Sequence, residues 1–160
     1  MTAPPVVLRQ AGVIPYRVVD GKVQVLLITS RRRRQWTIPK GNIPAGSTAA
    51  KAAEKEAFEE AGVKGVIKSA APLGAYTYGK RLASGTVPAV VEVYLMRTVR
   101  QVKKWREKGQ RTLEWVSIEQ AVVRSAEPGF APLLDRLLEL ETSLIQGERT
   151  DSTVGPSRST

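Results

Sequence analysis

Two neighbouring segments near the start of the chain have the composition of β-strands. Residues 10–19 and 23–30 are rich in β-branched and apolar side chains, and the dipeptide Asp20-Gly21 lies between them. An Asp-Gly dipeptide is typical of two-residue hairpin turns, because both central residues must adopt a positive φ. The pattern therefore predicts an antiparallel β-hairpin.

Further along the chain, short apolar runs predict more strands, and 3.6-residue spacing predicts three helices. A short strand over 36–38 ends at Pro39, and strand-like runs cover 73–78, 87–98 and 113–116. Helical patterns cover 48–61, 118–125 and 130–145, with Ser47 expected as the N-cap of the first helix and Gly62 as its C-terminal stop. Because strands stand before, between and after helices, we predict an α/β fold with helices packed on a mixed sheet.

The length of 160 residues and the hydrophobic fraction of 42% suit one domain. We expect a flexible N-terminus over 1–5, the domain over 6–145 and a disordered polar tail over 146–160. No apolar run approaches the roughly 18 residues of a membrane span, and the first residues lack a signal-peptide pattern. We therefore expect a cytoplasmic protein with no membrane partner.

Cysteine and histidine are both absent from the sequence. Their absence excludes disulfides, thiolate zinc sites, a cysteine nucleophile and a histidine base. If the chain is an enzyme, its proton transfers must use carboxylates, lysines, hydroxyls or a metal-bound water.

Two basic stretches account for the net charge of +10. Residues 31–40 contain five cations and no acid, and residues 97–111 contain seven cations and one acid. A basic field of this kind concentrates anions of any type, so the charge alone leaves polyphosphate, nucleic acid and anionic membranes open.

The most informative segment is residues 41–63, GNIPAGSTAAKAAEKEAFEEAGV. At 100° per residue, Glu56, Glu59 and Glu60 lie within about 100° of arc on one helix face. Another face carries small residues that allow close packing on a sheet, namely Ala50, Ala53, Ala57 and Ala61. The helix should therefore hold three carboxylates in fixed positions.

Three neighbouring glutamates repel one another, and the C-terminal half of a helix disfavours anions. A solvated acidic face, relieved by the pair Lys55–Glu59, is the simplest interpretation of this spacing alone. A divalent cation such as Mg²⁺ would remove both penalties, because it binds a few carboxylates and bridges to phosphates.

The segment resembles the Nudix box, G-x5-E-x7-R-E-U-x-E-E-x-G-U, in which U is a bulky aliphatic residue. The matching positions are Gly41, Glu56, Glu59, Glu60, Gly62 and Val63. Ser47 and Lys55 replace the glutamate and arginine that commonly brace the helix in this family, and Ala57 is small for U. Because both residues of the brace differ from those of the family, no buried charge need lack its partner. The brace is nevertheless weaker.

The resemblance extends over residues 9–140. The segment Trp36-Thr37-Ile38-Pro39-Lys40-Gly41 is similar to the lead-in of the box. Residues 59–65 and 113–115 are similar to the diphosphoinositol polyphosphate phosphohydrolase branch, which cleaves diphosphoinositol polyphosphates and dinucleoside polyphosphates. The resemblance implies a Nudix-type α/β/α sandwich with a mixed sheet, and it leaves a homodimer open.

The resemblance also implies roles for particular residues in a pyrophosphohydrolase that uses Mg²⁺ or Mn²⁺. The implied metal ligands are Glu56, Glu59, Glu60 and the carbonyl of Lys40. The implied catalytic residues are Glu59 and Glu60, Lys55 at the brace position, and Glu107 and Glu114 as further candidate bases. The implied contacts to an anionic polyphosphate substrate are Arg9, Arg31, Lys40, Lys80, Arg81 and Arg111.

A different class of function also fits the basic charge. The chain could be a non-catalytic nucleic-acid-binding module on a Nudix scaffold, using the run Arg31–Arg34. It lacks the sequence signatures of RRM, KH and zinc-finger modules. The intact glutamates of the box favour hydrolysis, because a binding module has no use for them.

Overall fold

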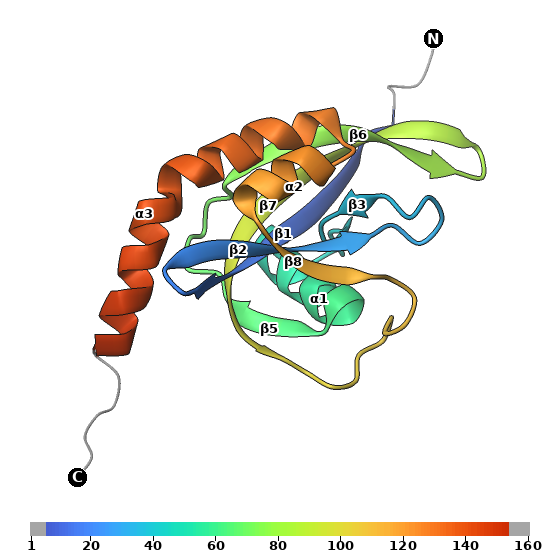
Figure 1. Cartoon of the computed structure of the whole chain (residues 1–160). Helices are drawn as coiled ribbons and strands as arrows, with labels where there is room; N and C mark the ends of the chain where they lie inside the picture. Colours follow the sequence, from blue (N-terminus) through green and yellow to red (C-terminus); the bar gives the residue numbers. More distant parts are fainter. Residues whose placement is uncertain (1–5, 154–160) are drawn as a thin grey trace.

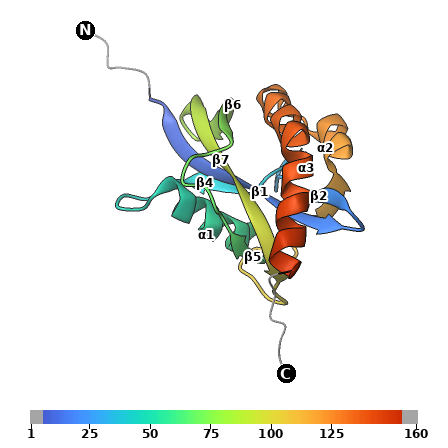
Figure 2. The same cartoon turned by 90° about the vertical axis from the view of Figure 1, so that its left-hand side faces the viewer.

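A mixed sheet lies between helices in the computed structural model, which describes residues 6–153 (Figure 1). Helix α1 (Ala49–Ala61) covers one face of the sheet. Helices α2 (Ile118–Arg124) and α3 (Ala131–Thr153) lie on the other face (Figure 2). The predicted α/β/α architecture is therefore confirmed.

The first two strands form the hairpin that the sequence predicts. Strands β1 (Leu8–Val19) and β2 (Lys22–Thr29) pair antiparallel with Val19 opposite Lys22. The turn residues Asp20 and Gly21 have φ values of 51° and 74°. Both values are positive, as a turn that follows the twist of the strands requires.

The centre of the sheet is a parallel pair of long strands. Strand β1 runs beside β7 (Gly85–Gln101), in register from Leu8–Ala89 to Tyr16–Arg97. The short strands on either side of this pair are β3 (Trp36–Thr37), β4 (Lys40–Asn42), β5 (Val63–Val66), β6 (Gly74–Leu82) and β8 (Leu113–Ser117). Strands β2 and β4 pair with β1, β5 and β6 with β7, and β3 and β8 with β2. The sequence predicted neither β4 nor β5, since both are too short to show a period.

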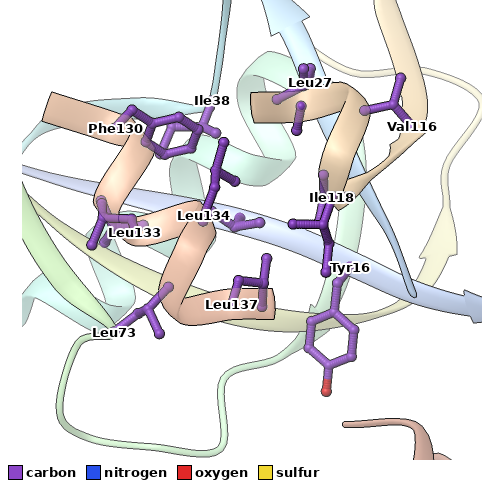
Figure 3. Close-up of a cluster of buried hydrophobic side chains, with 14 of the residues drawn as sticks. Tyr16, Leu27, Ile38, Leu73, Val116, Ile118, Phe130, Leu133, Leu134 and Leu137 are labelled. Carbon is purple, nitrogen blue, oxygen red and sulfur yellow. The ribbon is translucent and has the colours of Figure 1, made fainter. Parts of the chain in front are cut away.

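The two faces of the sheet bury two separate apolar clusters. Successive residues of a strand point to opposite faces, so Leu26 packs on the α1 side and Leu27 on the α3 side. Figure 3 shows the larger cluster, in which Phe130, Leu134 and Leu137 pack against the sheet. Phe130 ends the short helix η1 (Pro128–Phe130), so this cluster also fixes the segment that leads into α3.

Helix α1 differs from the prediction at its first residue. Thr48 is the N-cap, and its hydroxyl accepts a hydrogen bond from the Lys51 amide at 3.2 Å. Ser47 was the wrong choice, because its hydroxyl donates to the Thr48 carbonyl instead. Gly62 ends the helix as predicted, with a φ of 67°. The helix packs closely on the sheet through small buried residues, namely Ala52, Ala53, Ala57 and Ala61.

The last helix continues past the predicted end at Ile145 and reaches Thr153. The tail expected over 146–160 is therefore helical over 146–153, because a polar composition signals a lack of core packing rather than a lack of helix. Residues 1–5 and 154–160 lie outside the described residues. Within the described chain, no helix is long and apolar enough to cross a membrane.

Candidate active site

Helix α1 and strand β4 bring the predicted carboxylates against the backbone of residues 40 and 41. The Glu60 side chain is buried, and its Oε1 accepts a hydrogen bond from the Lys40 amide at 3.1 Å. The Glu56 carboxylate lies against Gly41, where a Cβ would collide with it. The glycine that begins the box is therefore required by close approach, and Glu56 and Glu60 contact neighbouring residues of β4.

The electrostatics of this cluster are unfavourable for the charged carboxylates. Burial raises the pKa of Glu56 to about 6, and the charges of Glu59 and Glu107 add to the shift. Burial also raises the pKa of Glu60 to about 7, while the Arg111 guanidinium lowers it and Glu56 and Glu107 raise it. Four carboxylates therefore share one region, which is the environment that a divalent cation would relieve.

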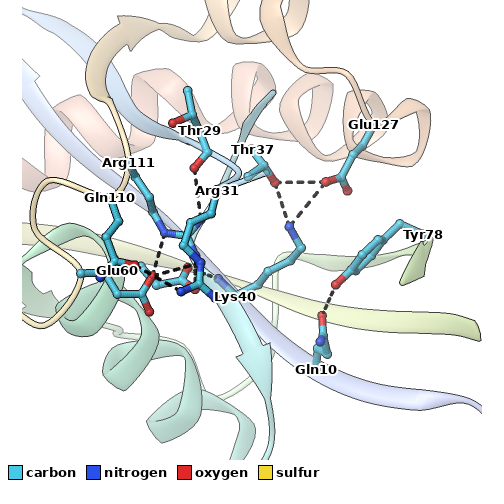
Figure 4. A network of polar contacts seen from close by, with 11 residues as sticks. Gln10, Thr29, Arg31, Thr37, Lys40, Glu60, Tyr78, Gln110, Arg111 and Glu127 are labelled. Carbon is cyan, nitrogen blue, oxygen red and sulfur yellow. Dashed lines mark hydrogen bonds and ion pairs between the residues drawn. The ribbon is translucent and has the colours of Figure 1, made fainter. Parts of the chain in front are cut away.

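Arg111 is the cation at the centre of this region (Figure 4). Its Nη2 donates to Glu60 at 3.1 Å, its Nε to Glu107 at 3.0 Å and its Nη1 to the Thr29 carbonyl at 3.1 Å. The side chains of Arg111 and Glu60 are each only 9% exposed. Arg111 thus joins the segment before β8 to helix α1 and partly neutralises Glu60 and Glu107.

The third box glutamate and the candidate base Glu107 also belong to this cluster. Glu59 accepts a hydrogen bond from exposed Arg106 at 3.3 Å, and its carbonyl accepts one from the Glu107 amide at 3.0 Å. With these side-chain positions, the described residues contain no group of three acids that could hold a metal ion. The chemistry of the donors still suits Mg²⁺ or Mn²⁺, because Glu56, Glu59 and Glu60 offer hard carboxylate oxygens on one helix face.

The Lys40 side chain points away from α1 into a second polar cluster (Figure 4). Its Nζ donates to Thr37 Oγ1 at 3.0 Å, lies 3.5 Å from Glu127 Oε1 and stacks 4.9 Å from the centre of the Tyr78 ring. Burial lowers the pKa of Lys40, while Glu127 and Glu60 oppose the shift. Lys40 therefore has its amide in the carboxylate cluster and its ammonium beside Glu127.

Sequence reasoning did not identify Glu127 as a site residue. It is an isolated acid in the loop between α2 and α3, ahead of Pro128-Gly129, and it has no motif around it. Its place beside Lys40 depends on the packing of η1, and no local spacing could have signalled it.

The two basic stretches meet in space. Arg31 Nη1 donates to Gln110 at 3.2 Å, and Arg34 donates to the Gln110 carbonyl at 3.0 Å and to Thr112 at 3.1 Å. Arg31 also lies 4.0 Å from Glu107. The β2–β3 loop and the segment before β8 therefore form one basic rim, whose members Arg32 and Arg33 are exposed.

The remaining predicted site residues lie outside these contacts. Arg9 pairs with Glu92 at 3.1 Å, and Glu114 pairs with Arg124 in a surface ion pair. Lys55 is exposed on α1, where its charge lowers the pKa of Glu56. Lys80 and Arg81 lie near the tip of the β6–β7 hairpin, with Lys80 on the same side of β6 as Tyr78.

Comparisons with known proteins cover most of the chain. A family model described as "NUDIX domain" matches residues 8–137. Nudix hydrolase 16 of Arabidopsis thaliana, named as mitochondrial, is 33% identical over 134 residues, which cover 74% of this chain and 72% of that protein. Diphosphoinositol polyphosphate phosphohydrolase 2 of Rattus norvegicus is 31% identical over 133 residues, covering 81% and 70%.

Other similar proteins extend beyond the matched region or share the fold at low identity. The chain covers 64% and 63% of the length of Arabidopsis Nudix hydrolases 13 and 12, which are also named as mitochondrial. The expected cytoplasmic location therefore stays a prediction. A Caenorhabditis elegans Ap4A hydrolase structure has a TM-score of 0.60 at 20% identity, covering 84% of this chain and 98% of that one. That likeness concerns the fold.

Proposed function

Because the chain belongs to the Nudix hydrolase family, we propose that it hydrolyses a phosphoanhydride bond in a polyphosphorylated small molecule. The observation that carries this proposal is the buried contact of Glu60 with both Arg111 and the Lys40 amide, beside Glu56, Glu59 and Glu107. Carboxylates beside buried cations provide both metal ligands and phosphate contacts, which are the main requirements of phosphoryl chemistry.

The substrate class is a diphosphoinositol polyphosphate or a dinucleoside polyphosphate. Two similar proteins carry names of these classes, a diphosphoinositol polyphosphate phosphohydrolase and an Ap4A hydrolase. The basic rim supports a substrate with several phosphates, because Arg31 and Arg111 both contact Glu107 and so lie together. The charge of Arg111 also acts on Lys40, whose ammonium lies in the second polar cluster, and Lys80, Arg81 and Arg9 are the more distant candidates.

Glu56, Glu59, Glu60 and the Lys40 carbonyl would hold Mg²⁺ or Mn²⁺. When bound, such an ion neutralises phosphate charge and makes an attacking water more acidic. The raised pKa values of Glu56 and Glu60 support this assignment, because an added cation lowers the cost of charging them. In the present side-chain positions, Glu59 and Glu60 pair with Arg106 and Arg111.

We infer that a carboxylate takes the proton of the attacking water, because the chain has no histidine and four carboxylates share the site. Glu59 and Glu60 are candidates within the box, and Glu107 is supported outside it by its contacts with Arg111 and Arg31. Glu114 has less support, since it accepts a hydrogen bond from Arg124 of α2. Lys55, at the brace position, acts on Glu56 through its charge.

A phosphate-release screen with Mg²⁺ and Mn²⁺ tests the proposal. Its substrates are nucleoside di- and triphosphates, nucleotide sugars, dinucleoside polyphosphates and diphosphoinositols. We expect turnover that depends on the divalent ion and is fastest for the last two classes. Steep salt-dependent binding of nucleic acid without turnover of any substrate would instead support the nucleic-acid-binding module.

A further inference from the structure

Lys40 and Glu127 form a nearly buried ion pair on the opposite side of β4 from the carboxylate helix. The Lys40 and Glu127 side chains are 15% and 21% exposed, and their charged atoms are 3.5 Å apart. Thr37 joins them, because its hydroxyl accepts from Lys40 at 3.0 Å and donates to Glu127 at 3.1 Å. The Lys40 ammonium thus contacts a hydroxyl and a carboxylate at once, with little water around it.

The packing of the surrounding elements holds this pair in place. Glu127 is the residue before η1, and its carbonyl accepts a hydrogen bond from the amide of buried Phe130 at 3.0 Å. The Phe130 ring packs edge-on against Tyr76, with 5.6 Å between ring centres. Glu127 therefore reaches Lys40 from a segment that the core fixes.

A hydrogen-bonded chain fixes the other wall of the Lys40 cluster. The Tyr78 hydroxyl donates to Gln10 at 2.8 Å, and Gln10 donates to Asn42 at 2.9 Å. Asn42 lies in β4, two residues after Lys40. The Tyr78 ring faces the Lys40 ammonium. Its hydrogen bonds through Gln10 and Asn42 connect it to β4, the strand that carries Lys40, and so fix the position of the ring.

We propose that Glu127 is a specificity-determining positioning residue that holds the Lys40 ammonium and weakens the binding of anionic groups to it. This proposal rests on the proposed function, in which Lys40 contacts a substrate phosphate. A phosphate that reaches Lys40 competes with Glu127 for the ammonium and lies near the negative charge of the Glu127 carboxylate. Both effects reduce affinity, and Glu127 therefore sets how strongly the site binds phosphate-rich substrates.

The test measures the binding of inorganic tripolyphosphate by calorimetry, without divalent ions, to wild type, Glu127→Gln and the control Glu119→Gln. Glu127→Gln keeps the size of the side chain and removes its charge. From Coulomb's law at an effective dielectric constant between protein and water, we expect tripolyphosphate to bind about 5-fold tighter. Glu119 is exposed on α2, so its substitution should change binding by less than about 1.5-fold.

A Lys40→Met background separates exchange at Lys40 from a general change of charge. In this background, the gain in tripolyphosphate affinity from Glu127→Gln should fall below about 2-fold, because no ammonium remains to be released from Glu127. In turnover assays on polyphosphates, Glu127→Gln should lower KM by a similar factor and leave kcat within about 2-fold. If Glu127 had only a structural role, Glu127→Gln would lower the stability of the protein without tightening tripolyphosphate binding.

Unchanged or weaker tripolyphosphate binding by Glu127→Gln overturns the proposal, as does an equal gain in the Lys40→Met background. If Glu127→Gln does not fold, Glu127→Asp provides the test, since it keeps the charge but draws it back from Lys40. It should tighten binding about 2-fold, and no change would overturn the proposal. If the wild-type protein hydrolyses no phosphoanhydride, only the proposed function is overturned, because the binding measurements do not depend on catalysis.

Discussion

Arg111 and Glu60 form an ion pair across 3.1 Å in which neither side chain is more than 9% exposed. The pair connects the segment before β8 with the C-terminal half of α1, which are 51 residues apart in sequence. Arg111 therefore ties helix α1 to the segment before β8.

Replacing Arg111 by Met should destabilise the protein by about 3 kcal/mol at pH 8, because the change leaves Glu60 as a buried charge without its partner. Urea unfolding followed by circular dichroism measures the difference. The loss should shrink in a Glu60→Gln background, where no carboxylate charge is left behind. Arg124→Met is the matched control, since its partly exposed pair with Glu114 should contribute less than about 1 kcal/mol. Equal losses in both backgrounds would contradict the role given to the pair.

Glu59→Gln and Glu60→Gln should each reduce turnover of the best substrate by at least about 100-fold. Each change preserves the shape of the side chain and removes the charge of a metal ligand, which costs more than the 10- to 100-fold typical of residues around the ligands. Phosphate release with Mg²⁺ and far-UV circular dichroism are measured together. The control is Glu139→Gln, at an exposed residue of α3, and it should keep the wild-type rate. Wild-type rates in both α1 variants would disprove the carboxylate assignment.

Glu56→Gln should stabilise the protein at alkaline pH when divalent ions are removed with a chelator. The pKa of Glu56 rises from 4.5 to about 6 on folding, so the folded state binds more protons than the unfolded state between these values. The stability linked to this group is therefore present below pH 4.5 and is lost as the pH rises through about 6. Allowing for the partial exposure of Glu56, the free energy of unfolding of the variant should equal that of wild type at pH 4 and exceed it by about 1 kcal/mol at pH 8. A gain of equal size at both pH values would show that the charge is not its cause.

Thr48→Ala should cost about 1 kcal/mol of stability, whereas Ser47→Ala should cost less than about 0.5 kcal/mol. The Thr48 hydroxyl accepts from the Lys51 amide, and the Ser47 hydroxyl caps no helical amide. Thermal unfolding of the two variants distinguishes them directly. The reverse order would restore Ser47 as the N-cap.

Replacing Arg31 and Lys40 by Ala should raise KM more for a tetra- or pentaphosphate compound than for a nucleoside diphosphate derivative. More phosphate charge makes more contacts with the basic rim, and salt should weaken this preference. The measurement is kcat/KM for both substrates at low and moderate ionic strength. A uniform loss, or none, would place these charges outside the substrate path.

The features that the sequence determined by itself are those set by neighbours along the chain. The turn at Asp20-Gly21 follows from two residue types that accept a positive φ. The common face of Glu56, Glu59 and Glu60 follows from the 3.6-residue period of a helix. The same spacing could not choose between Ser47 and Thr48, because both carry a hydroxyl and the cap depends on where the first helical turn begins.

Tertiary structure decided which distant residues meet. The parallel pairing of β1 with β7 brings together residues about 80 positions apart, and the packing of Phe130 carries Glu127 to Lys40, 87 positions away. The resemblance to the diphosphoinositol polyphosphate phosphohydrolase branch predicts Arg111 as a phosphate contact, but no feature of the sequence predicts its ion pair with Glu60. Such contacts depend on how whole elements pack against one another, and neither periodicity nor local propensity carries that information.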